Sequence, residues 1–231
     1  MLHKELIAAL LAALGNDADI NLHESPIRVT YRDTLCLEGE VANIAVKRKA
    51  RRIAVQLSGL ADIDDRLRLR PGERRSGKAL QDAVVDVLSQ EPAFRDISVL
   101  AGAAAPSGGR QWIGVSVDDC VVRLDGEVGS LSHRRLAEVI TWWVPGSCDV
   151  RNHMRVRPAE KDNDDEISDA IRMVLEKDPM LHAETIGIHT YNREVTLDGS
   201  VHSDEQRRMA IYDCWYVPGV HDVHDRMRVQ D

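Results

Sequence analysis

Aromatic residues are scarce in this sequence of 231 residues, at 4% of the chain with a single phenylalanine, Phe94. Any hydrophobic core is therefore built mostly from leucine, valine, isoleucine and alanine. Hydrophobic residues make up 43% and charged residues 29%, which excludes a collagen, a disordered tail and a multi-span membrane protein. The length suits two or three small domains.

Cysteine is sparse, and its spacing matches no metal or disulfide motif. The four cysteines are Cys36, Cys120, Cys148 and Cys214. None forms a C-x-x-C pair, so the spacing favours neither a zinc knuckle nor a disulfide framework. The sequence predicts buried or half-buried free thiols, as expected in a reducing compartment.

The N-terminal stretch MLHKELIAALLAALGND places Lys4 before an apolar run, as a secretory signal does. Glu5 interrupts the charged region, and no small-x-small cleavage site follows. The stretch also matches a helix that recurs later in the chain. We therefore expect no signal peptide, no transmembrane span and a cytoplasmic location by default. A periplasmic location is the alternative if a signal has been trimmed from the chain.

The net charge of −8 is unevenly distributed. Residues 1–75 carry +2, residues 76–158 carry −1 and residues 159–231 carry −9. A chain that is acidic overall does not attract nucleic acid as a whole, so we expect no nucleic-acid partner. The gradient would let the first and last regions attract each other, within one chain or between neighbouring chains.

Three segments share one pattern, which is the signature of an internal repeat. They are LCLEGEV at 35–41, VRLDGEV at 122–128 and VTLDGSV at 195–201. Successive copies lie 87 and 73 residues apart, and the same two shifts align a later glycine and three apolar positions. The first helices of successive copies lie 74 and 87 residues apart instead. The distance from first helix to strands is therefore longer in the middle copy, by 13 residues relative to the first copy and by 14 relative to the last.

The extra residues are expected in AGAAAPSGGRQW (101–112), whose composition is typical of a flexible insertion. Polar, proline-led linkers lie at 71–77 and 158–165. The predicted modules are listed in chain order: module 1 at 1–71, module 2 at 76–158 and module 3 at 164–231. We call them the first, middle and last modules.

Each module has the same predicted elements. An amphipathic helix precedes two short alternating strands joined by a tight polar turn, which form a hairpin. A second helix, near 43–57, 131–143 and 203–216, ends at a glycine that caps it. A last alternating strand follows. The predicted fold class is α+β, with three tandem α-β-β-α-β modules, each a three-stranded mixed sheet with two helices on one face. The glycine within the second strand predicts close approach of a neighbouring backbone, or a bulge.

This combination resembles the BON domain, the bacterial osmotic-stress and nodulation module. The last module carries its Leu-x-Gly-x-Val strand at 197–201, its Val-Pro-Gly-Val turn at 217–220 and its last strand at 223–229. The first module departs from the pattern, with Leu-Ser-Gly-Leu at 57–60 in place of the turn. The resemblance implies a non-catalytic module that binds phospholipid membranes or tethers partners, often in envelope stress. Some relatives sense potassium.

Basic residues recur at equivalent repeat positions and are the first candidate binding residues. Each second helix opens with a basic pair, and each last strand carries an arginine that alternates with core residues. The set comprises Lys47, Arg48, Arg134, Arg135, Arg207 and Arg208 on the helices, and Arg68, Arg155 and Arg228 on the strands. Two interpretations stay open: a basic face for lipid headgroups or an acidic partner, or a solvated face with cross-strand pairs such as Glu38–Arg68.

Aromatic residues close two of the second helices, at Trp142-Trp143 and Trp215-Tyr216. Adjacent helix residues point about 100° apart, so one of each pair is expected in the core and its neighbour nearer the surface. Such a ring could sit at a membrane interface or a domain contact, or simply pack on the Pro-Gly turn.

No enzyme motif stands out in the sequence, and we expect no catalytic residue, cofactor or metal site. The sequence HDVHD at 221–225 resembles a metal cluster, but in a strand His221 and His224 face opposite sides. The leading hypothesis is attachment to phospholipid surfaces. The alternatives are a protein-interaction scaffold that uses open sheet faces, and a small-ion sensor.

Overall fold

The computed structural model describes residues 2–60, 62–70, 72, 75, 77–107 and 111–230. The chain divides into two compact units, residues 1–70 and 71–231. The first unit holds one copy of the α-β-β-α-β repeat and the second holds two, so the predicted α+β fold class is confirmed. Parts of the predicted first linker and insertion lie outside the described residues: 71, 73, 74, 76 and 108–110.

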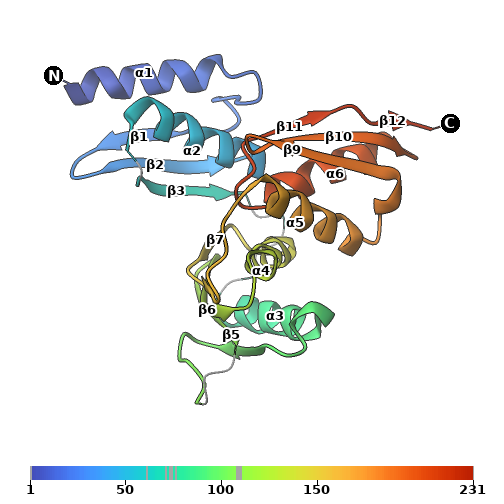
Figure 1. Cartoon of the computed structure of the whole chain (residues 1–231). Helices are drawn as coiled ribbons and strands as arrows, with labels where there is room; N and C mark the ends of the chain where they lie inside the picture. Colours follow the sequence, from blue (N-terminus) through green and yellow to red (C-terminus); the bar gives the residue numbers. More distant parts are fainter. Residues whose placement is uncertain are drawn as a thin grey trace. The chain divides into compact units, whose positions relative to one another are not determined.

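The first unit is a three-stranded sheet with two helices on one face (Figure 1). Its elements are α1 (Leu2–Asn16), β1 (Arg28–Tyr31), β2 (Leu35–Val41), α2 (Ile44–Ser58) and β3 (Asp64–Leu69). The central strand β2 pairs antiparallel with β1 and parallel with β3. The parallel pair needs a crossover, which α2 supplies by returning over the sheet beside α1.

An aliphatic core fills the space between these helices and the sheet. Leu37, Val41 and Leu67 point from the strands, and Leu10 and Ala50 point from the helices, all with no exposed surface. Alternation along the strands sends the neighbouring side chains to the opposite, helix-free face. We call this helix-free side the open face of each module.

Both ends of α2 are capped by local chemistry. The Asn43 side chain accepts a hydrogen bond from the Val46 N–H, which satisfies a donor at the helix start. At the other end Gly59 adopts the left-handed conformation with φ 67°, and its N–H donates to the Val55 carbonyl. These caps explain why α2 begins and ends within one residue of the predicted bounds. The second helices of the other two modules end instead at Val144 and Val217 in extended conformation, so the predicted glycine cap is wrong there.

The middle module repeats this plan with one extra strand. Its elements are α3 (Gly77–Gln90), a short 3-10 turn η1 (Pro92–Phe94), β4 (Ser98–Ala101), β5 (Trp112–Asp118), β6 (Val121–Val128), α4 (Leu131–Trp143), β7 (Asp149–Asn152) and β8 (Arg155–Val156). The hairpin β5–β6 turns at Asp119, which has a positive φ of 57°. The last strand is split into β7 and β8, and both pieces pair parallel with β6.

The last module follows the same order without the extra strand. Its elements are α5 (Asp164–Lys177), η2 (Ala183–Thr185), β9 (Ile186–Tyr191), β10 (Glu194–Val201), α6 (Asp204–Tyr216), β11 (Asp222–Asp225) and β12 (Arg228–Val229). Its hairpin turns at Asn192 and Arg193, as the sequence predicts, and both have positive φ. The last strand is again split and parallel to the central strand.

The inserted segment of the middle module differs from the flexible loop expected there. Strand β4, just before the alanine-rich stretch, pairs parallel with the edge strand β5 from Ser98↔Trp112 to Ala101↔Val115. Loop-like composition therefore marks only the connection back to β5. The extra residues extend the sheet by one strand beyond the predicted three.

The central-strand glycines are explained by a close backbone approach. Gly39, Gly126 and Gly199 all have positive φ. A Cβ on them would lie 2.2, 2.1 and 2.1 Å from the carbonyl oxygens of Pro26, Trp112 and Thr185, respectively. No side chain fits at that distance, so the predicted close approach of a neighbouring backbone is confirmed in all three copies.

Candidate interaction surfaces

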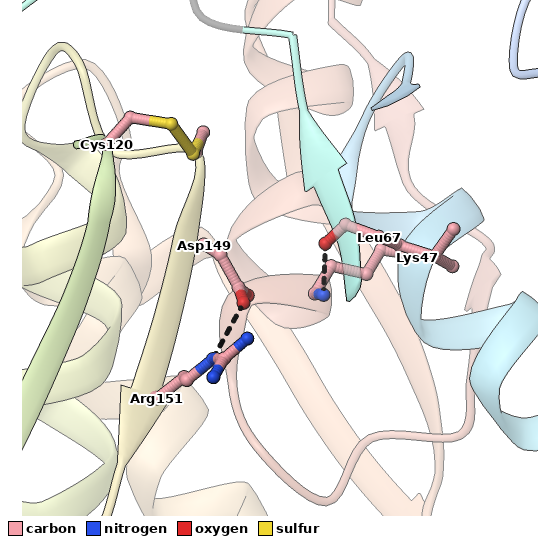
Figure 2. The surroundings of a disulfide bond; sticks show 6 residues. Lys47, Leu67, Cys120, Asp149 and Arg151 are labelled. Atoms are coloured by element: carbon pink, nitrogen blue, oxygen red, sulfur yellow. Dashed lines mark hydrogen bonds and ion pairs between the residues drawn. A yellow bond between two sulfur atoms is a disulfide. The ribbon is translucent and has the colours of Figure 1, made fainter. Parts of the chain in front are cut away.

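The first basic residue of each helix pair bonds to the last strand of its own module. This corrects the prediction that these residues form a basic binding face. Lys47 is buried, and its Nζ donates to the Leu67 carbonyl at 2.5 Å (Figure 2). The same Nζ donates to Asp65 at 3.1 Å. In each case a cation at the start of the second helix fastens the last strand, because the two are neighbours across the crossover. The equivalent contacts are Arg134 to the carbonyls of Met154 and Asn152, and Arg207 to Asp225.

The second residue of the pair in the middle module holds the last module in place. Arg135 is 3% exposed. Its guanidinium donates to the Pro218 carbonyl at 3.0 Å, to the Glu166 carbonyl at 3.4 Å and to Asp162 at 2.6 Å. Burial would raise the pKa of the Asp162 carboxyl, but Arg135 and Arg193 outweigh it and lower that pKa. Arg135 thus joins a helix of one module to the turn, linker and helix start of the next.

The remaining basic residues of the predicted set are more accessible. Arg48 is half-buried, whereas Arg208 is exposed. The strand arginines Arg68, Arg155 and Arg228 are all exposed on the open faces, as the alternating pattern predicts. Only part of the predicted basic surface is therefore available to a partner.

The helix-closing aromatics lie mostly inside the protein. Trp142 and Trp215 are 6% and 4% exposed, and their neighbours Trp143 and Tyr216 are half-buried, so the predicted division within each pair is confirmed. The rings of Trp142 and Tyr216 lie 6.1 Å apart between centroids and join the middle and last modules. Burial excludes Trp142 and Trp215 from a membrane interface, which corrects that option in favour of a domain contact.

The open faces carry interleaved charges of both signs. In each module, exposed arginines or histidines contact carboxylates that lie on the adjacent strand or two residues away on the same strand. These contacts are Arg28–Glu38 at 3.7 Å and Arg66–Asp64 at 2.7 Å, Arg123–Asp125 at 2.7 Å and Arg157–Glu127 at 2.8 Å, and His189–Asp198 at 3.3 Å and His224–Glu194 at 3.2 Å. Such pairs contribute little stability in solvent, but they give each face a specific pattern for electrostatic recognition.

A polar pocket of about 360 Å³ opens on this face of the first unit. Cys36 is half-buried within it, opposite Thr30 on β1 and Asp64 on β3. Burial raises the pKa of the Cys36 thiol, and the charge of Asp64 raises it further. A thiol that stays protonated is a poor nucleophile, so the pocket has no activated cysteine.

A disulfide joins Cys120 to Cys148 (Figure 2), and the prediction that these two thiols are free is wrong. Strands β6 and β7 pair parallel from Val121↔Asp149, so the residues just before each strand lie side by side, with Cα atoms 5.3 Å apart. The last module places Arg193 and His221 in the same positions, where the His221 N–H donates to the Arg193 carbonyl. The repeat alignment is the signal that could have revealed this pair. Cys36 and Cys214 remain free thiols.

Asp213 is a buried acidic residue that no motif of the sequence indicates. It lies on α6 at 5% exposure, and the repeat shift of 73 places Ile140 at the same position in the middle module. Burial and, to a lesser extent, the neighbouring Asp178 raise the pKa of the Asp213 carboxyl, a hydrogen bond from Trp143 opposes them, and the net result is a pKa of about 8. Asp213 is therefore a neutral acid at pH 7.

The histidines at 221–225 do not form a metal site. His224 pairs with Glu194, and the described part of the chain contains no group of three or more histidine, cysteine or acidic side chains placed to hold a metal ion. Within the same residues, every helix is too short or too polar for a bilayer crossing.

Comparison with known proteins gives one strong match. The sequence profile of the BON domain matches residues 4–71, 106–158 and 163–231. No curated protein sequence matches the chain.

Among solved structures, the chain is similar at 14% identity to the C-terminal domain of CdsD, the structural protein of the type III secretion system of Chlamydia trachomatis. That match covers 94% of this chain and 100% of the other, with a TM-score of 0.27. The PrgH periplasmic domain matches at 12% identity over 91% of this chain and 98% of its own, with a TM-score of 0.24.

Proposed function

Because the chain belongs to the BON-domain family, with three tandem copies along its length, we propose that it is a non-catalytic protein-interaction scaffold. Its module bounds are 1–71, 76–158 and 164–231 in this proposal. The open sheet faces bind the partner, and the helices bind neighbouring modules. No cofactor or reaction is part of this role.

One observation carries the proposal: the Arg135 contact between the middle and last modules. The middle module already recognises another module of the same chain by donating to two backbone carbonyls and one carboxylate from a buried guanidinium. Arginine suits this task because its planar fork offers several donors in fixed geometry. The open faces add ordered pairs of opposite charge, which favour specificity toward a charged protein surface.

Site-specific photo-crosslinking in the source cells tests this role. A benzophenone amino acid replaces Arg155 on the open face of the middle module, and in the control it replaces Val87, an exposed residue of α3. We expect a covalent protein adduct at position 155 and none at position 87. Adducts at neither position, or equally at both, would contradict recognition by the open face.

Phospholipid attachment is the second candidate, and the charge of the first module favours it. This region is the only net basic part of the chain by sequence. Its open face exposes Arg28, Arg66 and Arg68. Anionic headgroups attract such residues within a Debye length, although Glu38 and Asp64 partly neutralise them.

Vesicle co-sedimentation decides this candidate. The full chain is mixed at low salt with vesicles of phosphatidylcholine, with or without phosphatidylglycerol. Attachment predicts pelleting with the anionic vesicles only, and a loss of pelleting on Arg66→Glu. A protein that stays in the supernatant with both vesicles removes the lipid role and leaves the scaffold proposal intact.

The Cys120–Cys148 bond favours an oxidising compartment for this role. We therefore propose the periplasmic alternative in preference to the cytoplasmic default. Alkylation of the thiols in denaturant, directly after the cells are quenched in acid, followed by mass spectrometry, tests this. Two protected cysteines support the proposal, and four alkylated cysteines overturn it.

A further inference from the structure

The sheet edge formed by the hairpin's first strand is covered in the middle module. There the chain's own segment β4 lies parallel to β5, from Ser98 to Ala101. The Ser98 N–H donates to the Gln111 carbonyl at 3.0 Å, and the Gly102 N–H donates to the Val115 carbonyl at 2.6 Å. The outer groups of β5 are thus satisfied by an added strand.

The stretch Pro26–Val29 of the first unit is the structural counterpart of Trp112–Val115. Pro26 places its carbonyl oxygen beside Gly39, as Trp112 does beside Gly126. Ile27 and Val29 are buried at 7% exposure each, as are their counterparts Ile113 and Val115 at 0%. The two stretches therefore have the same orientation in their sheets.

The backbone of this stretch presents unpaired groups on its outer side. Since Pro26 directs its carbonyl toward β2, the alternate residues Ile27 and Val29 direct their N–H and C=O groups away from the sheet. Among the described residues, the backbone groups of Ile27 and Val29 make no hydrogen bond beyond the β1–β2 ladder. Unlike β5, β1 is an edge strand of the sheet that the described residues form.

A groove lies along the same edge and provides an apolar surface. It has a volume of about 470 Å³ and is lined by Leu11 of α1, Leu22 and the stretch from Pro26 to Val29. Leu11 is 39% exposed. In the middle module the corresponding space between α3 and β5 is where β4 packs.

We propose that the edge of β1 binds an extended segment of a partner polypeptide, which adds to the first unit as a parallel strand beside Pro26–Val29. This is strand addition, in which backbone hydrogen bonds supply affinity and pockets for alternate side chains supply specificity. Strand β4 is already paired with β5 in the middle module, so the strand added to β1 comes from a partner polypeptide. The β4–β5 pairing shows the backbone geometry that such an edge accepts.

The chemistry of the partner segment follows from the β4 pairing. Val99 lies opposite Ile113 and Ala101 opposite Val115, so side chains on the helix side are small or β-branched and apolar. Leu100 lies opposite Gly114, whose counterpart in the first unit is Arg28. An acidic side chain at this position would meet the Arg28 guanidinium. The preferred segment therefore has an apolar–acidic–small sequence in extended conformation.

The inference shares with the proposed scaffold role only the premise that the partner is a polypeptide. It concerns the edge of one sheet and not the open faces. A peptide-binding measurement on the purified chain therefore succeeds or fails independently of the crosslinking at position 155.

The test uses the intact chain and a fluorescent peptide of residues 96–103, DISVLAGA, with Leu100→Glu and Leu100→Pro forms of the same peptide. We expect saturable binding by anisotropy, tighter by about threefold for the Leu100→Glu peptide at low salt. The Leu100→Pro peptide is expected not to bind, because proline removes the N–H that alternates with those of Ser98 and Gly102.

Variants of the chain locate the peptide. Leu11→Gln removes apolar contact from the groove and is expected to weaken binding by about tenfold. Leu57→Gln is the matched control, since Leu57 is an equally accessible leucine (48% exposed) outside the groove lining. Amide hydrogen exchange at Ile27 and Val29 is expected to slow when the peptide is added.

Four results of the peptide-binding and exchange measurements would overturn the proposal. They are absence of saturable binding, equal binding of the proline form, equal effects of the two leucine variants, and protection at Trp112–Val115 instead of Ile27 and Val29. The last would mean that the peptide had replaced β4. A chain that is dimeric by light scattering, with Ile27 and Val29 already protected, would identify a second copy as the occupant and would also overturn it.

Discussion

The first and middle modules share one order of elements but differ in what covers them. The middle module is covered at its sheet edge by β4, its hairpin turn is joined to the start of β7 by Cys120–Cys148, and Arg135 fastens it to the last module. The first unit, taken by itself, keeps an open edge and a groove beside β1. One repeat can therefore become either part of a two-module body or an adapter, through a few residues outside its core pattern.

Removing the disulfide should have the largest effect, and in one unit only. Cys120 and Cys148 are separated by 28 residues, and closing such a loop in the unfolded chain accounts for about 3.5 kcal/mol. The double Cys→Ser variant is expected to lower the denaturation midpoint of the second unit and leave that of the first unchanged. Cys36→Ser is the control. An equal loss in both units would show that they unfold together.

Alanine at the central glycines should affect both units alike. A Cβ at Gly39 or Gly126 meets a carbonyl oxygen at about 2 Å, so the strands must separate, at about 3 kcal/mol. Gly39→Ala should destabilise the first unit and Gly126→Ala the second in urea titrations. Gly59→Ala is the control, since no atom lies within 4 Å of its added Cβ and only its positive φ opposes alanine. A smaller loss at Gly39 than at Gly59 would contradict the shared architecture.

The Arg135 contact should distinguish the middle module from the last. Arg135→Ala leaves two carbonyls without this donor and the half-exposed Asp162 with Arg193 alone, and is expected to lose about 2 kcal/mol. Arg208 has the same repeat position but is exposed, so Arg208→Ala should lose almost nothing. Calorimetry should also separate the unfolding of the middle and last modules in Arg135→Ala. Similar losses for the two variants would refute the joining role of Arg135.

The smallest effect, counted per pH unit, is a pH dependence of the last module that comes from Asp213. The carboxyl of Asp213 has a pKa of about 8 in the folded protein and near 3.8 when unfolded. The folded state therefore holds the extra proton between these values, and stability falls as pH rises through this window, by up to about 1.4 kcal/mol per pH unit. Asp213→Asn should flatten this dependence, whereas Asp204→Asn on the exposed part of α6 should not. Parallel curves for wild type and Asp213→Asn would contradict the assignment.

The sequence predicts the repeated parts well because they depend on local rules. Alternating strands around a glycine, polar turns and helix N-caps such as Asn43 and Ser130 are encoded within a few residues. This is why the hairpins at Asp119 and Asn192 and the bounds of α4 agree with expectation. The open-face positions of Arg68, Arg155 and Arg228 follow from the same two-residue period.

The binding residues are harder to predict, because the sequence of a helix's first turn does not show which of its side chains will face solvent. Lys47 and Arg48 point about 100° apart, and only the position of the following strand decides that Lys47 turns inward to Leu67. Arg134 and Arg207 follow for the same reason. Burial of Trp142 depends on contact with Tyr216 of the next module, which no pattern within one repeat contains.

By itself the sequence determined three copies of one α-β-β-α-β unit, since periodicity and glycine placement are properties of the chain alone. Tertiary structure decided which copies pack together, which cysteines meet and which sheet edge stays open. Those features depend on residues far apart in the chain, such as Arg135 and Pro218 or Cys120 and Cys148. Their proximity arises only when parallel strands and neighbouring modules are in place.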